Sequence, residues 1–364
     1  MSRIYRKKLA VLIPAHNEEL ALEMTIRSAV RAGMKKRDIY VVNDASTDST
    51  ARIAHQILGR RNVLTVRRSG KAVATKKAIK KFDFVGRYTW MHVADADSIF
   101  ARDYFKQLKS KLDPGRFAAA TGYVQSLKGG IISRFRVFEY VWGFDVVRRI
   151  QSWFGIITVI PGPTSCLRTD IIPKLNFDTG SLTEDFDITM QIHRQKLGQI
   201  QFVARAKTYT QDPQDFKDFT DQVNRWYRGF FQGVMSHRIG LKGRRIDWYV
   251  LWLLGQNTYY GAMTFLVIPA MAILLHRPYL ISLIILGEII SDLVITLLAA
   301  WRAGRPDIVW AFPYFPLLRL TGLLLFYRAF FEVVILRKFK HKDHKPGWDT
   351  EGRRYRITGD MVAN

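Results

Sequence analysis

The chain has 364 residues, enough for one large domain or two smaller ones. Lys and Arg number 56 against 31 Asp and Glu, and the formal net charge of +25 favours an anionic partner: nucleic acid, a membrane surface or a charged substrate. The single cysteine, Cys166, excludes a disulfide framework and a cysteine-based metal cluster, and is compatible with a reducing compartment.

The first part of the chain, to about residue 125, alternates between strand-like and helix-like patterns. Strands are expected at 8–14, 38–44, 62–68 and 88–97, and helices at 19–33, 49–58 and 70–82. The N-terminal apolar run, 9–13, is too short for the apolar region of a signal peptide and fits a buried strand. The alternation predicts an α/β fold with a mostly parallel sheet, which binds ligands beyond the carboxyl ends of its strands.

Three long apolar stretches follow, at 248–275, 279–300 and 310–335, each long enough to reach across a bilayer. Trp and Tyr near their ends and short basic segments between them are typical of membrane helices. We therefore expect a cytosolic domain over 1–240 with interfacial helices toward its end, membrane helices over 241–337, and a basic cytosolic tail over 338–364.

Both ends in the cytosol require an even number of crossings, although three stretches are present. Either the first stretch is partly interfacial, as its polar centre at 256–258 indicates, or Pro313 and Pro316 divide the third into a re-entrant turn and a span.

Four charged residues lie inside these stretches: Glu288, Asp292, Arg319 and Arg328. A charge that faces lipid without a partner costs about 3 kcal/mol at mid-bilayer. At least one of the acids is therefore expected to pair with an arginine, or to face a polar path.

Polar residues at the expected strand ends suggest a site. In "ADADS" (94–98), Asp95 and Asp97 can both reach one divalent cation or one nucleotide at a strand-to-loop turn, and such hard ligands suit Mg²⁺ or Mn²⁺. A solvated turn has the same spacing. Lys71, in "SGKA" (69–72), either reaches a phosphate or ribose or simply begins a basic helix.

Two further segments carry reactive side chains. "SLTEDFD" (181–187) offers a carboxylate as general base, or only the acidic first turn of a helix. In "DQVNRWYRG" (221–229), Gln222, Arg225 and Trp226 share one helix face by their spacing. An amide, a permanent cation and a flat ring suit a phosphorylated sugar.

In order and spacing these motifs resemble the family 2 inverting glycosyltransferases, and more narrowly the membrane-embedded, processive synthases of cellulose, chitin, hyaluronan and poly-N-acetylglucosamine. The resemblance covers residues 8 to about 240 and rests on Asp44, Asp95-X-Asp97, Thr183-Glu184-Asp185 and Gln222-X-X-Arg225-Trp226. "PGPTSCLRTDII" (161–172) is similar to the stretch that lines the acceptor site of those synthases.

The resemblance implies a GT-A type domain that uses a UDP-sugar donor, Mn²⁺ or Mg²⁺, and a saccharide or lipid-linked acceptor. It implies that Asp185 is the general base and Asp97 the metal ligand. It assigns nucleotide binding to Asp44, Lys71, Asp95 and Arg225, and acceptor binding to Gly162, Thr183, Glu184, Gln222 and Trp226.

The chain also departs from these synthases. Hydrophobic helices are absent before the catalytic part and few after it, so one chain is expected to be too small to wall a polysaccharide channel, which leaves a homo-oligomer open. In the tail, Trp348, Thr350 and Arg353 resemble a gating element, although the same segment also reads as a basic tail held on anionic lipid.

Rival interpretations explain less. A nucleic-acid-binding protein leaves the apolar stretches unexplained, and a channel or transporter leaves the acidic motifs without a role. A non-processive transferase that adds one sugar to a lipid-linked acceptor remains the alternative. The expected location is the cell (inner or plasma) membrane, crossed more than once, with the catalytic domain in the cytosol.

Overall fold

A computed structural model describes residues 8–241, 243–338 and 356. Eight strands form one sheet in the order β3-β2-β1-β4-β7-β6-β8-β5. The strands are β1 Leu9–Ala15, β2 Ile39–Asp44, β3 Val63–Val66, β4 Trp90–Val93, β5 Ile99–Phe100, β6 Phe117–Ser126, β7 Ser165–Arg168 and β8 Gln199–Thr210.

The parallel arrangement expected for the first four strands is confirmed, because β3, β2, β1 and β4 pair in parallel. The sheet as a whole is mixed: β7 is antiparallel to both β4 and β6, and β5 is antiparallel to β8. A crossover helix is needed only between parallel neighbours, and such helices follow β1, β2 and β3. The expected strand over 88–97 is shorter, because the chain turns after Val93 and brings Asp95 and Asp97 to the strand's carboxyl end.

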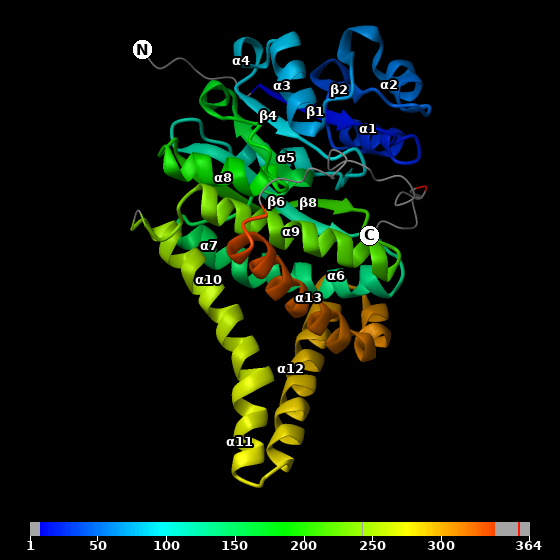
Figure 1. Ribbon diagram of the computed structural model, residues 1–364. Coiled ribbons are helices and arrows are strands. Elements are labelled where there is room, and N and C mark those ends of the chain that lie inside the picture. Colours follow the sequence, from blue (N-terminus) through cyan, green and yellow to red (C-terminus); the bar gives the residue numbers. More distant parts are fainter. Residues whose placement is uncertain (1–7, 242, 339–355, 357–364) are drawn as a thin grey trace.

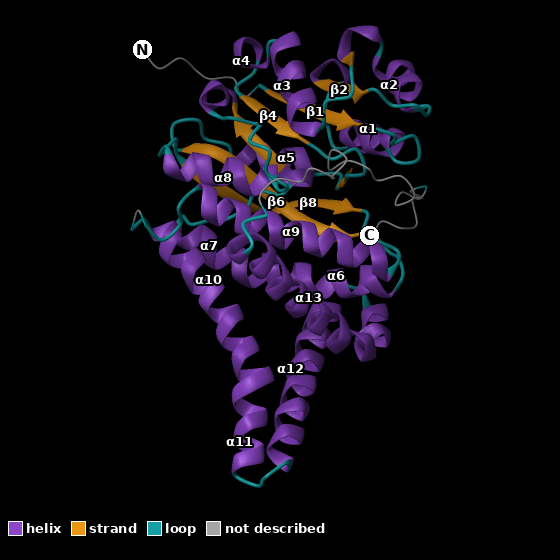
Figure 2. Cartoon of the chain, in the orientation of Figure 1, coloured by secondary structure: helices purple, strands orange, loops and turns teal. Residues whose placement is uncertain are grey.

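Helices surround the sheet and continue below it (Figures 1 and 2). Around the sheet they are α1 Leu22–Arg31, α2 Thr50–Leu58, α3 Lys71–Lys81, α4 Phe84–Arg87, α5 Tyr104–Lys111, α6 Ile131–Val141, α7 Arg148–Phe154, α8 Glu184–Arg194 and α9 Phe216–Ser236. After them come α10 Arg245–Ala262, α11 Ile268–Leu274, α12 Tyr279–Ala303 and α13 Phe315–Phe330.

Tighter or wider helical turns complete the chain. Wider π-type turns, η3 Trp142–Val147, η6 Met263–Val267 and η8 Phe331–Ile335, continue α6, α10 and α13 respectively. Short 3₁₀ segments are η1 Lys36–Asp38, η2 Arg60–Asn62, η4 Gly162–Thr164, η5 Thr169–Lys174 and η7 Pro306–Tyr314.

The core forms on both faces of the sheet, and β1 shows why. Its side chains alternate in direction, so Val11 and Ile13 pack with α1 and α5 on one face, while Ala10 and Leu12 pack with α3 on the other. A strand that is buried on both faces must be apolar at nearly every position, as 9–13 is.

The long apolar stretches form two different structures. The helix from α10 to α11 turns back into α12, and this hairpin projects from the domain (Figure 1). The segment 306–335 instead runs along α9, where Phe315 and Leu318 pack against Phe135 and Phe219. Within the described residues, two segments are long and apolar enough to cross a membrane: Tyr279–Ala303 and Pro306–Ile335. The first expected stretch, 248–275, is not one of them.

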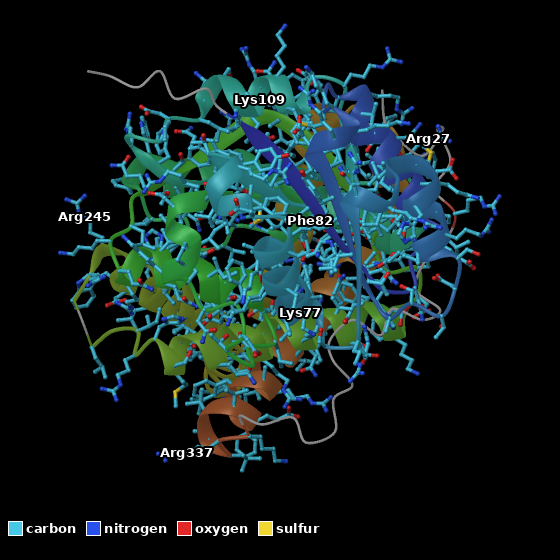
Figure 3. All side chains as sticks on the ribbon, turned by 90° about the horizontal axis from the view of Figure 1, so that it is seen from above. Arg27, Lys77, Phe82, Lys109, Arg245 and Arg337 are labelled. Atoms are coloured by element: carbon cyan, nitrogen blue, oxygen red, sulfur yellow. The ribbon has the colours of Figure 1, made fainter. Side chains whose placement is uncertain are left out.

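The charges inside the apolar stretches are paired, as expected. Arg319 on α13 bonds to Asp292 on α12, and its Nη1 lies 3.9 Å from Glu288 Oε2. Arg328 bonds to Glu332 at 2.9 Å. On the domain itself, basic side chains such as Arg27, Lys109 and Arg245 project from separate parts of its edge rather than from one arm (Figure 3).

Candidate active site

A cavity of about 270 Å³ opens at the carboxyl ends of the strands. Segments far apart in sequence line it: the turn after β4, the start of α3, the loop before β7, the start of α8, the loop after β8, and α9. Ten residues predicted from the sequence lie on its wall: Lys71, Asp95, Asp97, Gly162, Thr183, Glu184, Asp185, Gln222, Arg225 and Trp226.

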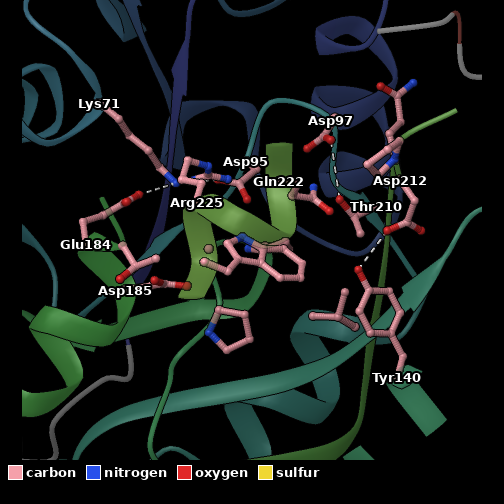
Figure 4. A pocket seen from close by; sticks show the side chains of 18 of the residues that line it. Lys71, Asp95, Asp97, Tyr140, Glu184, Asp185, Thr210, Asp212, Gln222 and Arg225 are labelled. Carbon is pink, nitrogen blue, oxygen red and sulfur yellow. Dashed lines mark hydrogen bonds and ion pairs between the residues drawn. The ribbon is translucent and has the colours of Figure 1, made fainter. Parts of the chain in front are cut away.

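Lys71 joins two of the predicted motifs. Its Nζ lies 2.7 Å from Asp95 Oδ1 and 2.8 Å from Glu184 Oε1 (Figure 4). Burial alone would lower the pKa of Lys71, but the two carboxylates outweigh burial and raise it above its ordinary value. The ammonium group is therefore charged at neutral pH and faces the cavity.

Glu184 and Asp185 begin α8 and have opposite pKa shifts. Burial opposes the ionisation of Glu184, yet Lys71 outweighs burial and lowers the pKa of Glu184. Burial and the charge of Glu184 raise the pKa of Asp185. The two adjacent carboxyl groups thus differ in proton affinity: Glu184 gives up its proton more readily, and Asp185 binds a proton more tightly, as suits a general base. The alternative for "SLTEDFD", an acidic first helical turn, also holds, and Asp187 bonds to Gln191 and His237 away from the cavity.

Two glycines allow close approaches at the site. A Cβ at Gly162 would lie 2.6 Å from Asp95 Oδ2, so a larger residue there would force the Asp95 carboxylate to shift. A Cβ at Gly229 on α9 would lie 2.4 Å from Thr183 Oγ1, so this glycine lets α9 pack against the start of α8. The second contact brings Arg225 within reach of Leu182 O, at 3.4 Å.

Asp44 does not line the cavity. Its fully buried carboxylate accepts hydrogen bonds from the backbone N–H groups of Ser69 and Gly70, both at 2.8 Å, and from Arg68 at 3.2 Å. These bonds hold the loop from which α3 and Lys71 begin. Asp44 therefore contributes to the site by positioning that loop, and its role toward a nucleobase stays a prediction.

The acidic residues of the cavity fit a divalent cation only in part. Asp97 is 3 % exposed, and Thr210 Oγ1 approaches its Oδ2 at 3.5 Å. Across residues 8–241, 243–338 and 356, no three His, Cys, Asp or Glu side chains are close enough together to hold a metal ion. Mg²⁺ commonly takes one or two carboxylates and completes its shell with phosphate oxygens and water. The site thus suits an ion that arrives with a diphosphate.

Among the residues in or behind the cavity wall that the sequence did not single out are Tyr140, Asp212 and Arg136. Tyr140 donates a 2.9 Å hydrogen bond to Asp212, and burial raises the pKa of Asp212 to about 6. Arg136 on α6 is 2 % exposed and lies behind the α9 residues. Its Nη2 donates to Gln222 Oε1 at 2.8 Å, and its guanidinium lies 4.7 Å from the centre of the Trp226 ring. No local pattern marks any of the three: Arg136 and Tyr140 lie on α6, which carries no motif, and Asp212 lies in the loop after β8, outside the predicted motifs.

A family profile described as "Glycosyltransferase like family 2" matches residues 6–229, more than half of the chain. The chain belongs to this glycosyltransferase family. The expectation of a nucleotide-sugar-dependent glycosyltransferase is thereby confirmed, and the matched range contains all ten cavity residues.

Two curated relatives of this family 2 chain have the same description. They are the poly-β-1,6-N-acetyl-D-glucosamine synthases of Staphylococcus aureus (strain COL) and Staphylococcus epidermidis, each 24 % identical over 251 residues. The match covers 67 % of this chain and 60 % of each relative. The chain therefore spans about 60 % of the relatives' length, less than two thirds.

A solved structure is also similar in fold to this glycosyltransferase. The mannosyltransferase PcManGT from Pyrobaculum calidifontis, solved with GDP-Man and Mn²⁺, superposes with a TM-score of 0.53 at 15 % identity, over 88 % of both chains. This likeness supports the GT-A type of fold that the motifs implied. The predicted gating residues, Trp348, Thr350 and Arg353, lie outside the described residues.

Proposed function

We propose that this family 2 protein is a membrane-bound inverting glycosyltransferase, which moves a sugar from a UDP-sugar to a growing β-linked polysaccharide. The observation that carries the proposal is the convergence on one cavity of an ammonium group, a guanidinium group and a carboxyl group of raised pKa: Lys71, Arg225 and Asp185. Cations suit the diphosphate of the donor, and the carboxylate suits the hydroxyl of the acceptor.

The reaction we propose is a single displacement. The acceptor hydroxyl oxygen attacks C1 of the sugar, the C1–O bond to the diphosphate breaks, and Asp185 takes the hydroxyl proton. Negative charge builds on the leaving diphosphate, where Arg225 and Lys71 stabilise it. Attack from the face opposite the leaving group inverts C1, so an α-linked donor gives a β-glycoside.

A divalent ion, Mn²⁺ or Mg²⁺, fits the acidic side of the cavity, and when bound it would neutralise the diphosphate as a Lewis acid. Asp97 is the residue we assign to hold it. Asp95, which bonds to Lys71 at 2.7 Å, keeps that lysine beside the diphosphate site.

On the acceptor side, the amide of Gln222 and the ring of Trp226 are the groups we assign to sugar binding. Arg136 has only donors, so it holds Gln222 Oε1 and leaves the amide N–H₂ group to face the cavity. Gly162, Thr183 and Glu184 complete this wall.

We assign the protein to the cell membrane, with its catalytic domain in the cytosol, where nucleotide sugars are made. Support comes from α12, which is long and apolar enough to cross a membrane, and from the hairpin in which α12 projects from the domain. As part of the same proposal, the protein exports its product across the membrane and acts as a homo-oligomer.

A second candidate function has an observation of its own. The hairpin has two legs, α10–α11 and α12, and α13 packs on α9 while it contacts the legs through Arg319 to Asp292 and Tyr327 to Thr258. Two legs cannot enclose a polysaccharide, so one chain acting alone would suit the transfer of a single sugar to a lipid-linked acceptor.

One experiment separates the two candidates. Purified full-length protein is incubated with a panel of UDP-sugars, beginning with UDP-N-acetylglucosamine because of the staphylococcal relatives, and the products are sized. A ladder of lengths indicates a polysaccharide synthase, and a single addition to added lipid acceptor indicates the alternative. Transfer from no nucleotide sugar at all would refute both.

A further inference from the structure

An apolar stripe runs along the helix that is formed by α6, η3 and α7. Its five members are Trp142 (48 % exposed), Val146 (36 %), Ile150 (44 %), Trp153 (90 %) and Phe154 (62 %). Spacings of three and four residues place them on one side of the helix. We call this surface the Trp153 face. Single apolar residues on a surface are common, but a Trp-rich stripe of this kind marks an interaction site.

The opposite side of the same helix belongs to the catalytic domain. Phe144 is buried in the core, and Tyr140 and Phe144 line the catalytic cavity. One helix therefore separates the cavity from the Trp153 face. With its side chains, a helix is about 10 Å across, so the two surfaces are close.

This helix also crosses the base of the hairpin. Asp145 bonds to Arg302, at the domain end of α12, at 3.1 Å. Gln151 Nε2 donates to Tyr249 Oη, near the start of α10, at 3.2 Å. The segment 145–151 thus connects both legs where they leave the domain, and the legs extend away below α6 and α7 (Figure 1).

We propose that the Trp153 face rests on the lipid headgroup region of the membrane that the hairpin enters. This inference rests on the proposed membrane attachment. Arg302 and Tyr249 lie at the domain ends of the two legs and contact the helix that carries the Trp153 face. If lipid surrounds the exposed apolar legs, its surface therefore lies next to this helix and reaches the Trp153 face. Trp is enriched at membrane interfaces, where its ring is apolar and its N–H group finds a hydrogen-bonding partner.

The charges beside the stripe suit anionic lipid. Arg149 and Arg302 are about half exposed, and both bond to the single carboxylate of Asp145. Two cations share one acid, which leaves net positive charge at the height of the headgroups. Phosphate groups of lipids are the matching partners. The catalytic cavity is then held about one helix diameter above the bilayer, within reach of an acceptor that is anchored in lipid.

The test uses a fluorescent label on the full chain in vesicles that contain phosphatidylglycerol. Ile150→Cys carries the label, because the native Cys166 is buried and does not compete for it. Val85→Cys, 41 % exposed on α4 at the end of the domain opposite the hairpin, is the aqueous control. Leu286→Cys, 51 % exposed on α12, is the membrane control.

We expect spin-labelled lipid to quench the label at 150 several-fold more than the label at 85, and iodide to do the reverse. If iodide quenches the labels at positions 150 and 85 equally, while the label at position 286 is shielded from iodide, this inference is overturned and membrane attachment stands. Exposure of 286 as well refutes the attachment itself. Shielding of 150 that appears only as protein concentration rises, with dimers seen by light scattering, identifies a second copy as the partner and also overturns it. None of these readings requires catalysis, so glycosyl transfer can succeed or fail independently.

Discussion

Arg136 lies between the two predicted acceptor-binding residues of α9: its guanidinium is 4.7 Å from the centre of the Trp226 ring and donates to Gln222 Oε1 at 2.8 Å. The guanidinium also lies 4.9 Å from the centre of the Phe219 ring. Because Arg136 occupies one face of Trp226, a sugar can stack only on the opposite face. Arg136 is thus a positioning residue for the acceptor.

Replacing Arg136 should weaken acceptor use more than donor binding. We expect Arg136→Met to lower kcat/KM for the acceptor on the order of tenfold to a hundredfold, since it loses a buried cation–π contact and a charged hydrogen bond. Arg136→Lys should recover little, because a lysine lacks the flat guanidinium group that lies over the Trp226 ring. Initial rates at varied acceptor, together with UDP titration, measure this.

The matched control is Arg134→Met on the same helix, where Arg134 bonds to Asp307 outside the cavity at 3.2 Å. Its acceptor KM should be unchanged. An Arg136→Met enzyme with reduced UDP affinity and an ordinary acceptor KM would contradict the assigned role.

Asp185→Asn should abolish transfer and leave UDP binding nearly intact. An amide cannot take the acceptor proton, and the loss of a general base lowers turnover on the order of a hundredfold or more. The control is Asp170→Asn, whose side chain is 65 % exposed and bonds to Arg168. Normal turnover of Asp185→Asn would assign the base elsewhere, with Glu184 as the next candidate.

The dependence of activity on pH should show the effect of Glu184 on the pKa of Asp185. Burial and Glu184 both raise the pKa of Asp185, and the base works only when deprotonated, so activity should fall with decreasing pH at a higher pH than for a carboxylate in water. Glu184→Gln removes one of the two causes and should shift this acidic limb to lower pH. An unchanged limb, or a shift to higher pH, would rule out this coupling; Glu23→Gln, on the surface of α1, is the control.

Activity should require Mn²⁺ or Mg²⁺, and Asp97→Asn should remove it. The loss should be about a hundredfold or more, since a diphosphate-bound cation contributes several kcal/mol to the stabilisation of developing charge. Assays with chelator and with added metal measure this, and Asp103→Asn, on an exposed turn, serves as control. Full activity in excess chelator would refute the metal requirement.

The pair between Asp292 and Arg319 should stabilise the fold. Arg319→Leu leaves Asp292, 2 % exposed, without this partner, and should destabilise the protein by about 3–5 kcal/mol. Removing both charges, by Arg319→Leu with Asp292→Leu, should restore most of the loss. Thermal unfolding in detergent measures both, and Arg328→Leu, with a 63 % exposed side chain, should cost less. A double variant no more stable than the single one would show that the pairing is not the cause.

The sequence by itself determined the features that depend on neighbours in the chain. Apolar runs such as 9–13 give strands, and the spacing of Gln222, Arg225 and Trp226 places them on one helix face because the helical repeat is local. The order of the motifs along the chain also sufficed to identify ten residues that meet in one cavity.

Tertiary structure alone decided what depends on distant segments. Arg136 contacts Gln222 across 86 positions, and Asp44 holds the loop before Lys71 rather than the cavity itself. Likewise, 306–335 packs against α6 and α9 because Phe315 meets Phe135 on α6 and shares a core cluster with Phe219 on α9, although its composition is that of a membrane helix. The hydrophobicity of a segment and the spacing of its apolar residues predict that a side chain will be buried. Only the packing of the whole chain decides which surface buries it.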